Sequence, residues 1–356
     1  MTASRRKLHG NEEAGFSLAV GGGLSSEPHL ALRVPVFVRW NQALPVIRAI
    51  TEIFRDSDCL RENRKRARMK YLFLKNGWTV ESFREALEEK LGYKLDPPVD
   101  AEPPVNPYRD HVGVHRQKQE GLYTVGVAVL RGRMRGEQLH IAAELAERFG
   151  NGLLRTTGMQ NLVFVNIPQH NVDALVKELE AAELRVDASP FWRGTIACSG
   201  TEFCKLAITE TKGYARWLVE ELERRLPGFN QHVKINITGC PNSCGQHWIA
   251  DVGIEGKKIK VDGRMIDAYY FCVGGAVGKY QGIARPTGFR CPAPDVPEAM
   301  ERLFRAFLAE RDEGESFRQF AARFEPEEIR AILAGTEVEA ALRDLPSGPV
   351  PQALEA

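Results

Sequence analysis

Hydrophobic and polar residues alternate with two different periods along the chain, and their order predicts a protein of mixed helices and strands. A short strand is predicted over residues 16–20, where it runs into three glycines. Helices are predicted over 44–54 and 80–91, and a further helix over the basic run 61–70. The segment 96–107 contains five prolines, which predicts a linker.

Beyond this linker the predicted order is strand, helix, strand, strand, helix. These elements cover residues 122–130, 137–149, 153–157, 162–167 and 172–184. The order is that of one half of a ferredoxin-like sandwich.

The last third of the chain is again mixed. A helix is predicted to begin at Cys204 and to end before Pro227. Strands are predicted over 233–238 and 268–273, followed by helices over 296–309 and 316–324. The proline-rich end, from residue 346, is predicted to be a loose tail.

An internal repeat connects the two ends of the chain. Residues 16–23 resemble residues 270–276, and residues 45–54 resemble residues 297–304, at separations of about 252 and 250 positions. Such nearly equal separations indicate one duplicated unit. Only 15 residues precede the first copy of the glycine signature. We therefore expect the first copy to be a remnant and most of one repeat to be missing.

The overall composition excludes several classes of protein. A length of 356 residues predicts two or three domains. With 43% hydrophobic residues, 27% charged residues and a net charge of +1, no nucleic-acid or membrane partner is expected. No apolar run reaches the roughly 20 residues that a transmembrane helix needs, and no secretory signal opens the chain. A cytoplasmic protein is expected.

Four of the seven cysteines form two close pairs. Cys198 and Cys204 are spaced C-x5-C, Cys240 and Cys244 are spaced C-x3-C, and 35 residues separate the pairs. Clustered soft thiolates favour an iron–sulfur cluster or zinc. Zinc ligands are usually two to four residues apart, so the wider gap favours a [4Fe–4S] cluster and leaves zinc as the alternative. The other cysteines are expected to be buried or incidental: Cys59, Cys272 and Cys291.

Four segments together resemble the sirohaem-dependent nitrite and sulfite reductases: Val20–Ser25, Arg155–Asn161, Cys198–Cys204 and Thr238–Gly245. The resemblance covers about residues 12 to 340. It implies a [4Fe–4S] cluster and sirohaem as cofactors. The cluster ligands would be Cys198, Cys204, Cys240 and Cys244, and Cys244 would also be the axial ligand of the sirohaem iron. The cofactor contacts would be Arg155, Thr156, Thr157, Gln160, Asn161, Thr238, Gly239 and Asn242.

The resemblance also divides the chain into an α+β (α/β) arrangement of domains. Residues 1–98 would be the C-terminal remnant of a first sirohaem-type α/β domain. Residues 99–188 would be the linker and the ferredoxin-like half-domain, and residues 189–340 the α/β domain that binds sirohaem and the cluster. Residues 341–356 would be the loose tail.

The reaction implied by the resemblance is a six-electron reduction of nitrite to ammonia or of sulfite to sulfide. The C-x5-C segment is more similar to the ferredoxin-dependent members, and the choice between the two substrates stays open. The sequence contains no flavin or nicotinamide motif. Reduced ferredoxin or a similar carrier is therefore the expected electron donor.

One departure from the family bears on catalysis. The Arg and Lys residues that bind the anionic substrate in the family lie in the half that this chain does not match, so no catalytic residue is assigned. We expect full activity to need that N-terminal half or a companion chain that supplies it. A non-catalytic subunit that holds the iron–sulfur cluster and sirohaem for electron transfer is the alternative function.

Several residues carry more local expectations. Gly239 and Gly245 are expected to let the backbone approach the cluster, and the helix dipole is expected to favour the thiolate of Cys204. The basic run 61–70 would contact sirohaem, contact the donor or simply be solvated. His247 is expected to begin a helix without a role in the chemistry.

Overall fold

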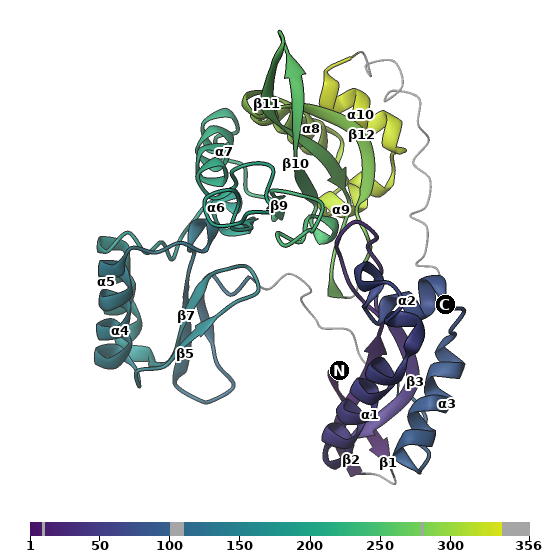
Figure 1. Ribbon diagram of the computed structural model, residues 1–356. Coiled ribbons are helices and arrows are strands. Elements are labelled where there is room, and N and C mark those ends of the chain that lie inside the picture. Colours follow the sequence, from purple (N-terminus) through teal and green to yellow (C-terminus); the bar gives the residue numbers. More distant parts are fainter. Residues whose placement is uncertain (9–10, 100–109, 279–280, 337–356) are drawn as a thin grey trace. The chain divides into compact units, whose positions relative to one another are not determined.

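The computed structural model of the protein describes residues 1–8, 11–99, 110–278 and 281–336. Its contacts divide the chain into two compact units, Met1–Val105 and Asn106–Ala356 (Figure 1). The division falls within the predicted linker. Most of that linker and all of the predicted tail lie outside the described residues.

Unit 1 is a three-stranded antiparallel sheet packed against helices. Its strands lie in the order β1 (Thr2–Leu8), β2 (Asn11–Val20), β3 (Leu32–Arg39). Its helices are α1 (Ala43–Asp56), α2 (Lys70–Lys75) and α3 (Val80–Leu91). Buried side chains from the sheet and the helices, including Val36, Ile53 and Phe83, form one core. The predicted strand and the two predicted amphipathic helices are therefore present.

α3 begins and ends where the sequence predicts because both of its ends are capped. Thr79 Oγ1 accepts a hydrogen bond from the Ser82 amide at 3.2 Å, and Ser82 Oγ accepts one from the Thr79 amide at 3.0 Å. At the other end Gly92 takes a left-handed φ of 72° and donates its amide to Glu88 O. Both arrangements satisfy backbone groups that a helix end leaves free.

The helix predicted over the basic run 61–70 is wrong. Only a single 3-10 turn, Arg64–Arg66, forms there, and α2 begins at Lys70. The side chain of Asn63 accepts a hydrogen bond from the Lys65 amide, which competes with helical pairing. Like charges three and four residues apart disfavour a helix further.

The first part of unit 2 is a four-stranded antiparallel sheet covered by two helices. Its strands lie in the order β4 (Gly113–Arg116), β5 (Leu122–Val127), β7 (Leu162–Pro168), β6 (Leu154–Thr156). The helices are α4 (Gly136–Phe149) and α5 (Val172–Ala181), which lie side by side against β5 and β7 (Figure 1). The predicted order of strands and helices is confirmed, and β4 is an additional edge strand.

The second part of unit 2 is a five-stranded mixed sheet. Its strands lie in the order β12 (Arg285–Pro292), β11 (Arg264–Val273), β10 (Val252–Val261), β9 (Ile235–Thr238), β8 (Thr195–Ala197). β8, β9 and β10 run parallel, whereas the other pairs are antiparallel. The surrounding helices are α6 (Pro190–Gly194), α7 (Lys212–Arg225), α8 (Val296–Glu310), α9 (Phe317–Ala322) and α10 (Pro326–Ala334).

The helix predicted to open at Cys204 is also wrong at its start. α7 begins at Lys212, and Cys204 lies in a turn in which its amide donates to Gly200 O at 2.9 Å. The chain between them is held by a distant segment, because the Ile208 amide donates to Gly239 O at 2.7 Å. The helix dipole therefore does not act on Cys204.

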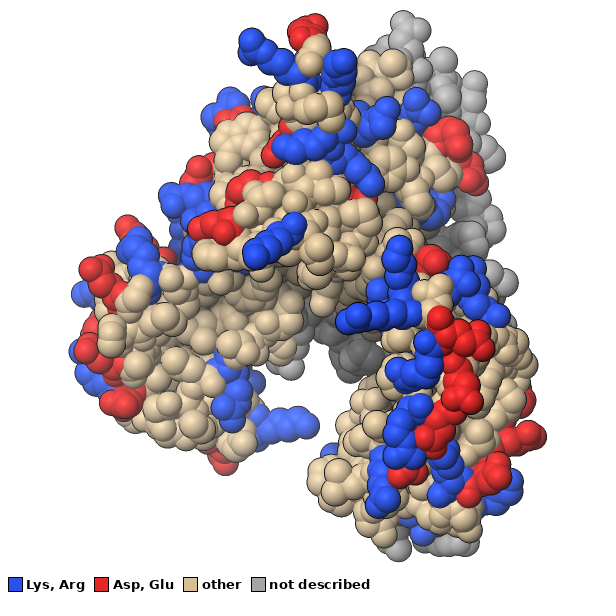
Figure 2. All heavy atoms as spheres, viewed as in Figure 1, with Lys and Arg blue, Asp and Glu red and all other residues tan. Residues whose placement is uncertain are grey.

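Charges of both signs mix on the surface. Figure 2 shows Lys and Arg side chains interspersed with Asp and Glu on the face in view, in keeping with the net charge of +1. Within the described ranges, no helix combines the length and the apolar character needed to cross a bilayer.

Candidate functional site

The two cysteine pairs follow two neighbouring parallel strands. Cys198 is the first residue after β8, and Cys240 is the second residue after β9. The pairing of the strands continues past β8, since the Cys198 amide donates to Ile237 O at 3.0 Å. Because parallel strands end at the same edge of a sheet, both pairs arrive at one place.

The four thiols lie close enough to affect one another. The pKa of Cys244 is raised first by burial and then by the charges of the other three cysteines, Cys198, Cys240 and Cys204. Across the described part of the chain, no three Cys, His, Asp or Glu side chains are arranged to hold a single metal ion. Thiolates are preferred ligands of both zinc and iron–sulfur centres.

Backbone and hydroxyl groups surround the first of these thiols. The Gly239 amide donates to Cys198 Sγ at 3.2 Å, and Thr211 Oγ1 lies 3.7 Å from the same sulfur. Thr211 is held there because its hydroxyl also donates to Cys198 O at 2.7 Å. A backbone amide that donates to a ligand sulfur, as that of Gly239 does, tunes a bound cluster.

The two glycines of this region allow close contacts within the protein itself. A Cβ on Gly245 would lie 2.1 Å from Ile237 O, and one on Gly239 would lie 2.9 Å from Thr209 O. Both glycines therefore allow neighbouring backbone segments to meet. The resulting close packing brings the C-x3-C turn against the strand that precedes it.

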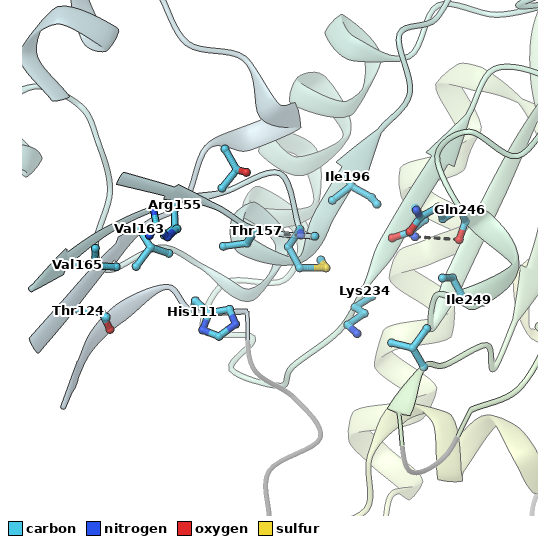
Figure 3. A pocket seen from close by; sticks show the side chains of 15 residues that line it. His111, Thr124, Arg155, Thr157, Val163, Val165, Ile196, Lys234, Gln246 and Ile249 are labelled. Atoms are coloured by element: carbon cyan, nitrogen blue, oxygen red, sulfur yellow. Dashed lines mark hydrogen bonds between the residues drawn. The ribbon is translucent and has the colours of Figure 1, made fainter. Parts of the chain in front are cut away.

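A pocket of about 590 Å³ opens beside this edge of the sheet (Figure 3). One wall comes from β5, β6, β7 and the loop after β6, and the other from β8, β9 and the segment after the C-x3-C turn. Its principal polar lining residues are His111, Thr124, Arg155, Thr156, Thr157, Lys234, Asn236 and Gln246. Gln246 is two residues from Cys244, so the pocket reaches the turn that carries this thiol.

The hairpin residues proposed from sequence divide into two groups. Arg155, Thr156 and Thr157 line the pocket. Gln160 and Asn161 instead bind backbone: Gln160 Nε2 donates to Ala197 O at 3.1 Å, and Asn161 Oδ1 accepts from the Val129 amide at 2.9 Å. They connect the hairpin to the strand that leads to Cys198 and to the end of β5.

The other proposed contacts lie in the C-x3-C turn. Thr238 is fully buried and its hydroxyl donates to Cys240 O at 3.3 Å, whereas Asn242 is exposed. Gly239 donates its amide to Cys198 as described above.

Three further polar residues of the pocket wall were not predicted from the sequence: Lys234, Asn236 and Gln246. The signal for Lys234 and Asn236 is visible over residues 234–238, where polar residues alternate with the fully buried Ile235 and Ile237. In a strand of period two this alternation directs Lys234 and Asn236 to the opposite face from the core. The amide of Asn236 is 3% exposed, and its Oδ1 has no hydrogen-bond partner within the described residues, although its Nδ2 donates to Gln246 O.

Comparisons with known proteins show the family. The sequence model of the nitrite and sulphite reductase 4Fe-4S domain matches residues 7–95 and 189–341, and that of the nitrite/sulfite reductase ferredoxin-like half domain matches residues 115–182. The chain therefore belongs to the nitrite and sulfite reductase family. Proteins of this family carry a [4Fe–4S] cluster and sirohaem.

Individual relatives have similar names. The chain is 39% identical over 331 residues to sulfite reductase [ferredoxin] 2 of Mycolicibacterium paratuberculosis, and 35% identical over 353 residues to the assimilatory ferredoxin-dependent nitrite reductase of Haloferax mediterranei. These matches cover 90% and 94% of this chain. They cover only 58% and 59% of the relatives, so the chain spans less than two thirds of their length.

A solved structure has the same fold. The NirA protein of Mycobacterium tuberculosis superposes with a TM-score of 0.84 at 38% identity, over 92% of this chain and 60% of the other. The described residues of the present chain fit both cofactors of the family. Four thiols converge beside a pocket that offers Arg155, Lys234 and several hydroxyls, and sirohaem, a tetrapyrrole with eight carboxylates, needs such cations and donors.

Proposed function

We propose that this chain forms the cluster-holding part of a ferredoxin-type nitrite or sulfite reductase. Cys198, Cys204, Cys240 and Cys244 would hold the [4Fe–4S] cluster, and Cys244 would also bind the sirohaem iron. The observation that carries this proposal is the convergence of two cysteine pairs at one sheet edge, next to a pocket with cationic walls.

The chain's own residues have distinct tasks in this proposal. Arg155 and Lys234, on opposite walls of the pocket, would bind carboxylates of the tetrapyrrole, and Thr156 and Thr157 would donate hydroxyl hydrogen bonds. Asn236 offers a buried acceptor with no other partner in the described structure. Sirohaem, when bound, would supply the redox centre for reducing nitrite to ammonia or sulfite to sulfide, with the six electrons coming from the external donor.

Substrate binding needs groups beyond those assigned here. An anion in a site of low dielectric constant is held only when fixed cations face it. The relatives extend well beyond the matched region, and we propose that further sequence or a companion chain supplies these cations. The complete enzyme would act in the cytoplasm.

A surface beside the first cysteine pair would bind an acidic electron carrier such as ferredoxin. Phe203 and Leu206 are 72% and 70% exposed, and the Arg133 guanidinium lies 5.6 Å from the Phe203 ring. Burial, and then the charge of nearby Arg133, lowers the pKa of Arg131, so cations gather here. Arg133 is paired with Glu202 at 2.7 Å, and a carboxylate of an acidic partner would compete with Glu202 for this guanidinium beside the exposed apolar groups.

The proposal is tested by anaerobic reconstitution with iron and sulfide. We expect about four iron atoms per chain, with each Cys→Ser variant at the four ligand positions losing the cluster. Cys59→Ser is the matched control, because Cys59 lies in unit 1 and should leave iron content unchanged. One zinc and no iron would refute the proposal.

Turnover separates the catalytic and non-catalytic alternatives. Reduced methyl viologen supplies electrons without a protein donor, and the consumption of nitrite and of sulfite is measured. Reduction of either anion identifies the substrate. A stable cluster and sirohaem without reduction of either anion, even with the complementary part of a relative added, would identify an electron-transfer subunit.

A further inference from the structure

A buried chain of hydrogen bonds runs behind the turn that carries Cys244. Ser243 Oγ lies 2.9 Å from His247 Nδ1, and His247 Nε2 lies 3.4 Å from Glu255 Oε2. Glu255 Oε1 lies 2.5 Å from Nζ of Lys257, which reaches the surface. Ser243, His247 and Glu255 are 3%, 2% and 7% exposed, so water competes little for these bonds.

The turn itself is conformationally strained. Ser243 and Gln246 adopt left-handed φ angles of 57° and 59°, which residues other than glycine rarely take. A residue in this conformation persists only where its surroundings hold it. Ser243 is held through its hydroxyl by His247, and the carbonyl of Gln246 is held by Asn236 Nδ2 at 3.0 Å.

The protonation state of Glu255 determines which atom donates in its hydrogen bond with His247. Burial alone would raise the pKa of Glu255, but hydrogen bonds from His247 and Lys257 outweigh it and lower this pKa. Glu255 is therefore a carboxylate at neutral pH, and it requires a hydrogen on His247 Nε2. On the other side of the ring, His247 Nδ1 shares a hydrogen bond with the Ser243 hydroxyl.

We propose that His247 is a positioning residue for Cys244, a role that rests on the proposed function of Cys244 as a cluster ligand. It holds Ser243, the residue before the ligand, in its left-handed conformation, and Glu255 orients the imidazole. The C-x3-C turn then keeps one shape, with the Cys244 thiol in place for the cluster. The sequence alone predicted no role for this histidine.

Two substitutions of His247 separate its two bonds. His247→Asn places an amide near the position of Nδ1 and keeps the bond to Ser243, whereas His247→Gln places it near Nε2 and keeps the bond to Glu255. Ser243→Ala removes the hydrogen bond between Ser243 and His247 by deleting the serine hydroxyl. Amide hydrogen exchange of residues 240–247 is measured in the cluster-free protein. We expect several-fold faster exchange in Ser243→Ala and His247→Gln, and exchange near the wild-type rate in His247→Asn.

The reconstituted protein gives a second measurement. Ser243→Ala and His247→Gln should release iron to a chelator several-fold faster than the wild type and alter the electron paramagnetic resonance spectrum of the reduced cluster, while His247→Asn should restore both. Equal behaviour of the two histidine variants, or wild-type exchange in Ser243→Ala, would overturn the positioning role. A wild-type protein without iron would refute the proposed function, and the exchange measurement would still decide the role of His247.

Discussion

Asn161 offers a sharp test of whether the hairpin after β6 is scaffold or cofactor site. Its side chain is 3% exposed, and its Oδ1 accepts the Val129 amide at 2.9 Å. Its Nδ2 lies 3.5 Å from Arg193 O, at the limit of a hydrogen bond. Asn161→Ala therefore removes one good acceptor and leaves a buried backbone N–H without a partner.

The expected loss follows from this geometry. An unsatisfied buried amide costs about 1–3 kcal/mol, and the weak second bond adds little. We expect the free energy of unfolding of unit 2 to fall by about 2 kcal/mol, which for a unit of this size lowers Tm by about 4–8 °C. Cofactor retention should be unchanged at temperatures where the variant is folded.

Urea unfolding followed by circular dichroism at 25 °C measures this change. Thr156→Ala in the same hairpin is the control, because Thr156 is exposed, lines the pocket and makes no side-chain hydrogen bond within the described residues. It should change stability by less than about 0.5 kcal/mol and weaken the retention of sirohaem. An Asn161→Ala protein as stable as the wild type, or one that specifically loses sirohaem while fully folded, would contradict the scaffold role.

Three further predictions concern other parts of unit 2. Gly245→Ala should destabilise the protein by about 3 kcal/mol, because its Cβ would lie 2.1 Å from Ile237 O, and thermal unfolding of the apo-protein measures this. Asp110 is paired with Arg193, and although burial alone would raise its pKa, this pairing lowers it. Asp110→Asn should therefore destabilise most at pH 7, and the difference from wild type in urea should shrink below about pH 4, as both forms become neutral. Arg133→Glu should slow cluster reduction by ferredoxin at low salt and leave reduction by dithionite unchanged; equal effects on both would remove the docking role of this surface.

Much of the fold follows from local patterns. α3 has the bounds that its caps and periodicity predict, and the strand and helix order between residues 122 and 181 is the predicted one. One predicted helix, over the basic run, does not form, and another begins only at Lys212, because other groups compete for the backbone. Asn63 captures the Lys65 amide in the basic run, and Gly239 O captures the Ile208 amide between Cys204 and α7.

The candidate site divides in the same way. The spacing of the four cysteines favours an iron–sulfur cluster without any coordinates, because ligand chemistry depends on residue type and short spacing, and the family resemblance of segments such as Thr238–Gly245 implies sirohaem. Lys234 and Asn236 could be recognised only by following the alternation within β9. Their assignment to the pocket needed the facing hairpin, which is far away in sequence.

The amino-acid sequence by itself determined the family, the order of most elements and the set of thiols that would hold a cluster. Tertiary structure alone decided that the thiols meet at one sheet edge, that Gln160 and Asn161 bind backbone, and that His247 lies buried between Ser243 and Glu255. The physical reason is the distance along the sequence over which each kind of information acts. Periodicity and spacing act over a few neighbouring residues, whereas these contacts join segments whose approach depends on the packing of the whole unit.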